Sequence, residues 1–146
     1  MDFVKNKLKQ TRLDSSKIIF ELLETQTFAN EDIVSEMITE LKSLGFKIAI
    51  DDFGTGHSNF AHIATIEVDY IKIDGMFIKN LESDALSEKM VKTLVSFANS
   101  IGALTIAEFV HNEAVFEFVK SLGVDYAQGY YKSPPISPRE LKEMMH

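Results

Sequence analysis

Short apolar runs alternate with amphipathic segments along the chain, and this alternation limits the fold more than any other feature. The runs typical of strands are residues 17–22, 47–50, 69–74, 103–107 and 124–127. The segments with helical spacing of apolar residues are 2–11, 31–44, 58–63, 83–100, 112–122 and a last helix that begins near Ser137. Strict alternation of strand and helix predicts a parallel sheet with right-handed crossovers. We therefore predict an α/β fold, either an open doubly wound sheet or part of a (β/α)₈ barrel.

Residues at the expected helix ends support these boundaries. Asn30 and Ser83 are the expected N-caps of two long helices, because short polar side chains accept hydrogen bonds from the free N–H groups of a first turn. The segment Ser-Pro-Arg-Glu at 137–140 has the pattern of a capping box. Gly45 and Gly102 are expected to end helices.

The segment 47–56, Lys-Ile-Ala-Ile-Asp-Asp-Phe-Gly-Thr-Gly, places two adjacent carboxylates at the end of a strand. Successive strand side chains point to opposite faces of a sheet. Asp51 and Asp52 can therefore reach one centre only if the chain leaves the strand there, which we expect Gly54 and Gly56 to permit. Two carboxylates held together favour a bound cation. The alternative interpretation is a solvated turn in which an aspartate caps a helix.

Polar side chains fall at corresponding places on the five expected strands. They lie within the strands or at their C-terminal ends, and they are Glu21, Asp51, Asp52, Lys72, Glu108 and Gln128. Barrels and open α/β sheets build their sites at that edge. Taken singly, each residue also has an interpretation without function: a glutamate can lie on the rim of the sheet, and a lysine can extend past the sheet edge into solvent. Their common register predicts a functional site.

The residue types at this edge favour a hard cation. The sequence has no cysteine, and its histidines form no pair, so the candidate ligands are carboxylate oxygens. Such ligands predict Mg²⁺ or Mn²⁺ rather than zinc. A carboxylate cluster beside a lysine suits phosphoryl chemistry, in which metals activate water and neutralise developing charge. The net charge of −7 argues against binding of duplex nucleic acid through a basic face.

The length of 146 residues with 45% apolar residues predicts one domain or part of one. No apolar run approaches membrane-spanning length, and residues 1–7 lack the core of a signal peptide. We therefore expect no membrane segment in this chain and a cytoplasmic location.

Five segments in this order resemble the successive motifs of EAL domains, the bacterial cyclic di-GMP phosphodiesterases. They are FELLET at 20–25, DDFGTGHS at 51–58, IKIDG at 71–75, IAEFV at 106–110 and AQGYY at 127–131. Members of this family are barrel enzymes that linearise the dinucleotide with two divalent metals. The resemblance therefore implies a TIM-type barrel, cyclic di-GMP as substrate, linear pGpG as product, and Mg²⁺ or Mn²⁺ as cofactor.

The resemblance also implies a role for each matched residue. The metal ligands would be Glu21, Asp51, Asp52 and Glu108, the loop supports Glu24, Gly54, Thr55 and Gly56, and the substrate contacts Gln128 and Asp74. Lys72 and Glu108 would be catalytic. Lys72 would position or deprotonate the attacking water.

Two features of the family do not occur in this sequence. One is the Glu-Ala-Leu signature, whose Glu is a metal ligand, and the other is the Asn-bearing strand that precedes the Glu21 strand. A complete barrel needs about 250 residues. We therefore expect residues 1–146 to form the C-terminal five βα units of a partial EAL domain, with an incomplete metal site. The two open sheet edges predict a homodimer or a partner that covers them.

Three functions remain open at this point. The first is a cyclic di-GMP phosphodiesterase domain, or a piece of one, that hydrolyses the phosphodiester. The second is a catalytically inactive regulatory or cyclic di-GMP-binding module with the same fold. The third is a receiver-like phosphoacceptor domain, which the motif order disfavours because Glu21 precedes the aspartate pair and Lys72 precedes Asp74.

Overall fold

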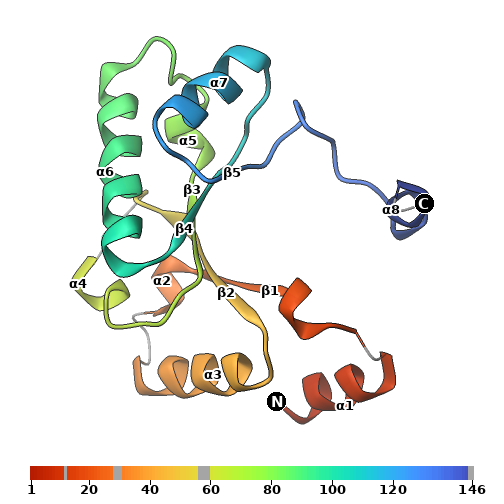
Figure 1. Ribbon diagram of the computed structural model, residues 1–146. Coiled ribbons are helices and arrows are strands. Elements are labelled where there is room, and N and C mark those ends of the chain that lie inside the picture. The colour runs from red at the N-terminus through yellow and green to blue at the C-terminus, as the bar shows by residue number, and fades with distance from the viewer. Residues whose placement is uncertain (12, 28–30, 56–59, 145–146) are drawn as a thin grey trace.

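A computed structural model describes residues 1–11, 13–27, 31–55 and 60–144. Its strands are β1 (Ile19–Leu23), β2 (Lys47–Phe53), β3 (Tyr70–Ile73), β4 (Leu104–Ala107) and β5 (Tyr126–Ala127). Its helices are α1 (Asp2–Thr11), the 3₁₀ turn η1 (Ser15–Lys17), α2 (Glu24–Thr27), α3 (Glu31–Ser43), α4 (Phe60–Ile63), α5 (Gly75–Ile78), α6 (Ala85–Ile101), α7 (Glu113–Ser121) and α8 (Pro138–Met144). Figure 1 shows α3, α6 and α7 around the sheet, whereas α8 stands apart from it at the end of an extended segment.

The five strands form one parallel sheet in the order β1-β2-β3-β4-β5, so each strand pairs with its neighbours in sequence. This arrangement confirms the predicted α/β class and the parallel sheet. Because all strands run the same way, their carboxyl ends meet at one edge. The polar residues that the sequence placed at the strand ends therefore share that edge.

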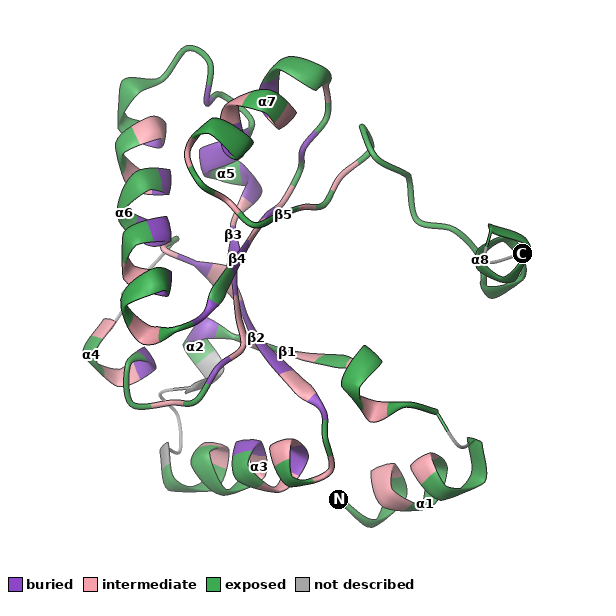
Figure 2. Cartoon of the chain, viewed as in Figure 1, coloured by how far each residue is buried: buried purple, intermediate pink, exposed green. Residues whose placement is uncertain are grey.

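The core lies between one face of the sheet and the helices. Ile48, Ile50, Ile71 and Ile73 are fully buried there with residues of α6, including Val91, Leu94 and Ala98. Figure 2 shows the buried colour along the middle strands and on the side of α6 that faces them. The alternate residues of each strand lie on the opposite face, which we call the open face.

The open face combines polar and apolar side chains. Asp51 and Lys72 lie toward its carboxyl end, and Glu21 lies in the middle of β1. The exposed apolar side chains of this face include Ile19, Leu23, Leu104 and Tyr126. The apolar run 17–22 is typical of a buried strand, but β1 alternates between exposed and half-buried residues. Burial depends on what covers both faces, and within the described residues β1 pairs with β2 alone.

The helix ends confirm part of the expected capping. Gly102 ends α6 with a φ of 76°, and the capping box forms as expected, since Ser137 N donates to Glu140 Oε2 and Glu140 N donates to Ser137 Oγ. The N-cap of α6 is Asp84 rather than Ser83, because its carboxylate accepts from the amides of Leu86 and Ser87. The expected cap Asn30 lies outside the described residues.

Two equivalent aspartates fix the starts of β3 and β5. Asp69 precedes Tyr70 and accepts from Ile48 N of the preceding strand at 2.9 Å. Asp125 precedes Tyr126 and accepts from Thr105 N of the neighbouring strand β4 at 2.8 Å. Both belong to a Val-Asp-Tyr triplet, at 68–70 and 124–126, and the two tyrosine rings contact each other at 6.0 Å. The repeat therefore helps to set the register of the β2–β3 pair and of the β4–β5 pair.

Within the described residues, no helix combines the length and the apolar character that crossing a bilayer requires.

Candidate metal centre

Lys72 lies at the middle of the predicted site. Its side chain is 4% exposed, and its Nζ contacts Glu21 Oε2 at 3.0 Å, Asp51 Oδ1 at 2.9 Å and Glu108 Oε1 at 2.9 Å. Glu21 lies in β1, Asp51 in β2, and Glu108 directly after β4. The Lys72 ammonium on β3 therefore connects three other strand segments. The three N–H donors of a lysine match three acceptors.

The surroundings of Lys72 keep it protonated. Burial by itself lowers the pKa of this amine, but the hydrogen bonds with Glu108, Asp51 and Glu21 outweigh burial and raise the pKa above its ordinary value. A lysine in this state donates hydrogen bonds and does not accept a proton. Of the two roles that the resemblance implied for Lys72, this geometry favours positioning over deprotonation.

A β-bulge, rather than the glycines, turns the two aspartates toward one centre. β2 continues through the aspartate pair to Phe53, and its register with β3 shifts between Ile50 and Phe53. Asp52 has a φ of 57°, which aspartate tolerates better than most residues. The expectation that the chain leaves the strand at the pair is therefore wrong. Gly56 lies outside the described residues.

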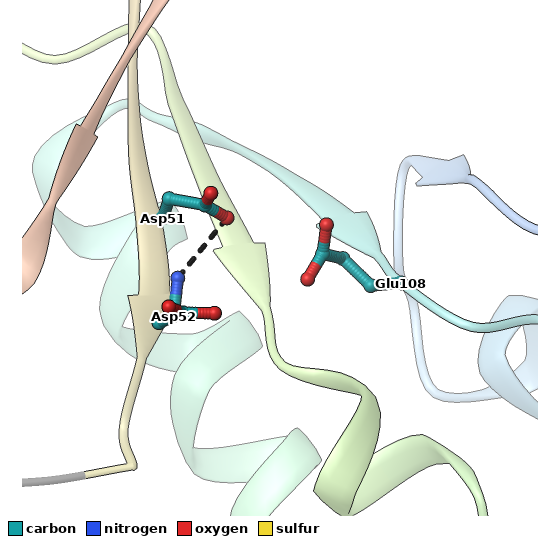
Figure 3. Close-up of side chains that lie close together, drawn as sticks. All are labelled: Asp51, Asp52 and Glu108. Atoms are coloured by element: carbon teal, nitrogen blue, oxygen red, sulfur yellow. Dashed lines mark hydrogen bonds between the residues drawn. The ribbon is translucent and has the colours of Figure 1, made fainter.

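Asp51, Asp52 and Glu108 each offer a carboxylate oxygen, and these oxygens lie within 4.8 Å of one another. Figure 3 shows the three side chains converging across β3, with Asp51 and Asp52 on β2 and Glu108 just beyond β4. Asp51 Oδ1 also accepts from Asp52 N at 3.1 Å. Three hard oxygen donors so close together fit Mg²⁺, Mn²⁺ or Ca²⁺.

The charges of this cluster are not balanced. Burial and the neighbouring charges of Asp51 and Asp74 raise the pKa of Asp52. Burial also raises the pKa of Glu108, the charges of Asp51 and Asp52 add to this effect, and Lys72 offsets it only in part. One lysine does not neutralise the carboxylates around it, so a further cation would stabilise their ionised forms.

Glu21 lies near Lys72 but outside the three-carboxylate cluster. In the register of β1 with β2, Glu21 pairs with Ala49, whereas Leu23 pairs with Asp51. Glu21 is thus two residues further from the carboxyl edge than Asp51. Its side chain is 48% exposed. The structure brings the predicted ligand Glu21 to the lysine and not to the predicted metal cluster.

Three of the four expected loop supports, Glu24, Gly54 and Thr55, lie in the described part of the chain and interact with the segment around the aspartate pair. Glu24 is buried, and its Oε2 accepts from Gly54 N at 3.2 Å. Gly54 has a φ of 94°, which favours glycine. A Cβ added to it would lie 3.3 Å from the side chains of Leu94 and Phe77. Thr55 Oγ1 donates to Asp52 O at 2.9 Å and closes the turn after the bulge.

The two predicted substrate residues lie in different places. Gln128 lines a pocket of about 450 Å³ with Glu108, Phe109, His111, Gly129 and Tyr130. Asp74 does not line this pocket. Its Oδ1 accepts from Met76 N at 2.6 Å and caps α5, and its charge acts on Asp52. Sequence reasoning did not find Phe109 and Tyr130 as pocket residues, although aromatic side chains directly after Glu108 and Gly129 were a visible signal.

Comparison with known protein families identifies the family of this chain. The family model described as EAL domain matches residues 1–135. The chain belongs to the EAL domain family. This membership removes the receiver-like interpretation of the aspartate pair and the lysine.

Similar proteins in the EAL family include named phosphodiesterases. The chain is 36% identical over 136 residues to the cyclic di-GMP phosphodiesterase PdeA of Borreliella burgdorferi, which covers 92% of this chain and 20% of that protein. It is 38% identical over 128 residues to the cyclic di-GMP phosphodiesterase PdeF of Escherichia coli, covering 88% of this chain and 17% of that protein. The chain therefore spans about a fifth of the length of the curated relatives it matches.

Solved EAL structures share the fold. The PaMucR phosphodiesterase in its c-di-GMP complex has a TM-score of 0.89 and 31% identity, covering 96% of this chain and 57% of that chain. The EAL domain of Mycobacterium smegmatis DcpA has a TM-score of 0.89 and 28% identity, covering 97% and 63%. EAL domains are TIM-type barrels, so the predicted membership of the sheet in a (β/α)₈ barrel is confirmed.

Proposed function

We propose that this chain carries the metal- and phosphate-binding half of a cyclic di-GMP phosphodiesterase site, which hydrolyses the dinucleotide to linear pGpG. The observation that carries the proposal is the contact of one buried lysine with carboxylates from three strand segments at the carboxyl edge of the sheet. Relatives named cyclic di-GMP phosphodiesterases support it.

Asp51, Asp52 and Glu108 would hold Mg²⁺ or Mn²⁺, because their oxygens converge and their charge exceeds what Lys72 neutralises. A bound divalent ion would supply an acidified water and neutralise charge on the phosphodiester. Glu24 and Thr55 hold the loop that follows the aspartates.

Lys72 would position the reacting groups. As an ammonium it orients the carboxylates of Asp51 and Glu108, and it can redirect a donor toward a phosphate oxygen or the attacking water when these arrive. Gln128 and the pocket beside Glu108 would receive the nucleotide next to the carboxylates. Asp74, whose charge raises the pKa of Asp52, would contact the substrate near Asp52.

A second candidate function is a cyclic di-GMP-binding or regulatory module without turnover. The position of Glu21 outside the three-carboxylate cluster favours it, since a two-metal site needs more ligands than these three residues offer. The pocket that would receive a nucleotide does not depend on Glu21.

The proposal also accounts for the exposed apolar side chains of the open face. Its exposed Ile19, Leu23, Leu104 and Tyr126 would be covered by the rest of an EAL barrel or by a second copy of the chain. The assignment of residues 1–146 as a partial EAL domain belongs to this proposal. A cytoplasmic location stays a prediction.

The test is to incubate the chain with cyclic di-GMP and Mn²⁺ and to measure pGpG by chromatography and nucleotide binding by calorimetry. Turnover that Lys72→Met lowers by about 10²–10⁴-fold, the range for a positioned acid-base or donor group, supports the phosphodiesterase. Binding without turnover, also after an upstream EAL segment is added, supports the module. A chain that neither binds nor hydrolyses the dinucleotide overturns both.

A further inference from the structure

The chain makes an unusual turn directly after Glu108. Phe109 has a φ of 57°, a region that a bulky side chain rarely adopts. Gln128 N donates to Ala107 O at 2.8 Å, and Gln128 O accepts from Val110 N at 3.0 Å. In a regular parallel ladder the returning donor would be the residue two after Ala107, which is Phe109. Phe109 is therefore an extra residue, and the chain has a β-bulge there.

The bulge decides where Glu108 points. Glu108 N stays bonded to Ile73 O at 3.1 Å, so this residue remains fixed to β3 while the chain turns at the next position. Its carboxylate reaches Lys72 at 2.9 Å. The aspartate pair on the other side of β3 has a matching bulge, with Asp52 at the same φ of 57°. Each carboxylate-bearing strand beside Lys72 thus has one bulge.

Two glycines fit closely against the bulge, Gly75 against Phe109 and Gly129 against Val110. A Cβ added to Gly75 would lie 2.8 Å from Phe109 Cβ, and one added to Gly129 would lie 2.2 Å from Val110 O. Gly75 is the first residue of α5, and its own backbone does not require glycine, because its φ is not in the left-handed region. Lys79 Nζ lies over the Phe109 ring at 4.3 Å from its centroid. Contacts on both sides therefore hold the bulge.

We propose that Phe109 is a positioning residue, whose left-handed backbone directs the Glu108 carboxylate to the Lys72 centre, and that Gly75 is glycine to make room for the Cβ of Phe109. The proposal rests on the proposed function only for its metal measurement. Its backbone measurement needs no metal.

The first experiment separates the backbone of Phe109 from its ring. Phe109→Gly and Phe109→Val both remove the ring, but glycine adopts a left-handed φ freely and a β-branched residue resists it. The Mn²⁺ affinity is measured by calorimetry, and exchange of the Glu108 and Val110 amide protons by NMR in metal-free buffer. We expect Phe109→Gly to stay within about twofold of the native affinity and protection, and Phe109→Val to lose at least tenfold in both.

Equal losses in the two variants would show that the ring matters and not the bulge, and an unaffected Phe109→Val would also overturn the proposal. If Phe109→Val does not fold, the pair Phe109→Asn and Phe109→Thr replaces it, because asparagine tolerates the left-handed region and the β-branched threonine resists it. If the native chain binds no Mn²⁺, the metal part of the proposed function fails while the exchange data still judge Phe109.

The second experiment is a rescue. Gly75→Ala should weaken Mn²⁺ binding at least tenfold, and adding Phe109→Gly should restore it, because the second change removes the atom that the new methyl group meets. Gly102→Ala is the matched control. It strains a left-handed φ of 76° with no neighbouring atom within 4 Å, so it should lower the melting temperature, keep the Mn²⁺ affinity and gain nothing from Phe109→Gly. No rescue of Gly75→Ala would contradict the proposal.

Discussion

Lys72 donates to Glu108 at 2.9 Å, yet the pKa of each group lies above its ordinary value. A balanced ion pair would raise the pKa of the amine and lower that of the acid. Here burial and the charges of Asp51 and Asp52 oppose ionisation of Glu108, while Lys72 gains from several acceptors at once. Carboxylates outnumber cations at this edge of the sheet, and together with the converging oxygens of Asp51, Asp52 and Glu108 this supports the metal proposal.

Removal of the ammonium should destabilise the metal-free protein. Lys72→Met keeps much of the side-chain volume but leaves several carboxylates facing one another. We expect the free energy of unfolding to fall by about 3 kcal/mol, as for breaking a buried ion pair, measured by urea unfolding in chelator. The matched control is Lys92→Met, which removes an exposed helical pair with Glu88 and should cost less than about 0.5 kcal/mol. Similar losses in both variants would show that the Lys72 ammonium contributes no more to the free energy of unfolding than an exposed ion pair does.

Metal binding should depend on Asp51. Asp51→Asn removes a charged oxygen ligand that also contacts Lys72, and we expect the Mn²⁺ affinity to fall at least tenfold, about 1.4 kcal/mol or more. Calorimetric titration measures it. Asp32→Asn, at an exposed position of α3, is the control and should bind as the native chain does. Equal affinity in Asp51→Asn would count against the site.

Asp69 should give the fold part of its pH dependence. Burial by itself raises the pKa of Asp69, but hydrogen bonds from Lys47 and Ile48 N and the charge of Lys42 outweigh burial and hold the pKa below its ordinary value. Because the folded-state pKa is lowered, ionised Asp69 contributes stability that is present above the unfolded pKa of about 4 and is lost as the pH falls through the folded pKa.

The variant Asp69→Asn tests this contribution. It should lose about 1–2 kcal/mol at pH 7 and should show a smaller fall in stability below pH ~4 than the native chain. Urea unfolding at a series of pH values measures both quantities. Parallel stability curves for the two proteins would mean that Asp69 does not contribute through its charge.

The open face should make the chain associate. Four exposed apolar side chains on β1, β4 and β5 lie on it, with two sheet edges beside them. We expect light scattering to show a mass above that of the monomer, and the charged variants Leu23→Lys and Leu104→Lys to lower it. Phe3→Lys changes an even more exposed apolar residue on α1, away from the open face, and should leave the mass unchanged. A native chain that stays monomeric at high concentration would contradict the expectation.

The alternation of strands and helices, and the sheet edge where the polar residues gather, could be predicted from the sequence, because apolar runs and helical spacing are local signals. The bulges at Asp52 and Phe109 could not, since each depends on the φ of one residue held by neighbours on other strands. The exposure of β1 could not be predicted either, because it depends on what lies beside the strand. The expected N-cap Ser83 was wrong because the next residue, Asp84, can also cap a helix and does so here.

The Val-Asp-Tyr repeat was visible in the sequence and its role was not. Asp69 and Asp125 lie in runs that resemble strand starts, and only the paired strands show that each aspartate accepts from the neighbouring backbone. Glu21 illustrates the opposite case. Its motif matched the family, but the register of β1 places it two residues away from the position that faces the cluster.

Anomalous diffraction from crystals of the chain grown with Mn²⁺ and cyclic di-GMP tests the central claim most directly. The account predicts a manganese peak within bonding distance of Asp51, Asp52 and Glu108, with Lys72 contacting the same carboxylates or the phosphodiester and the nucleotide reaching the pocket beside Gln128. A manganese peak elsewhere, or a bound nucleotide with no metal among these three carboxylates, would contradict it.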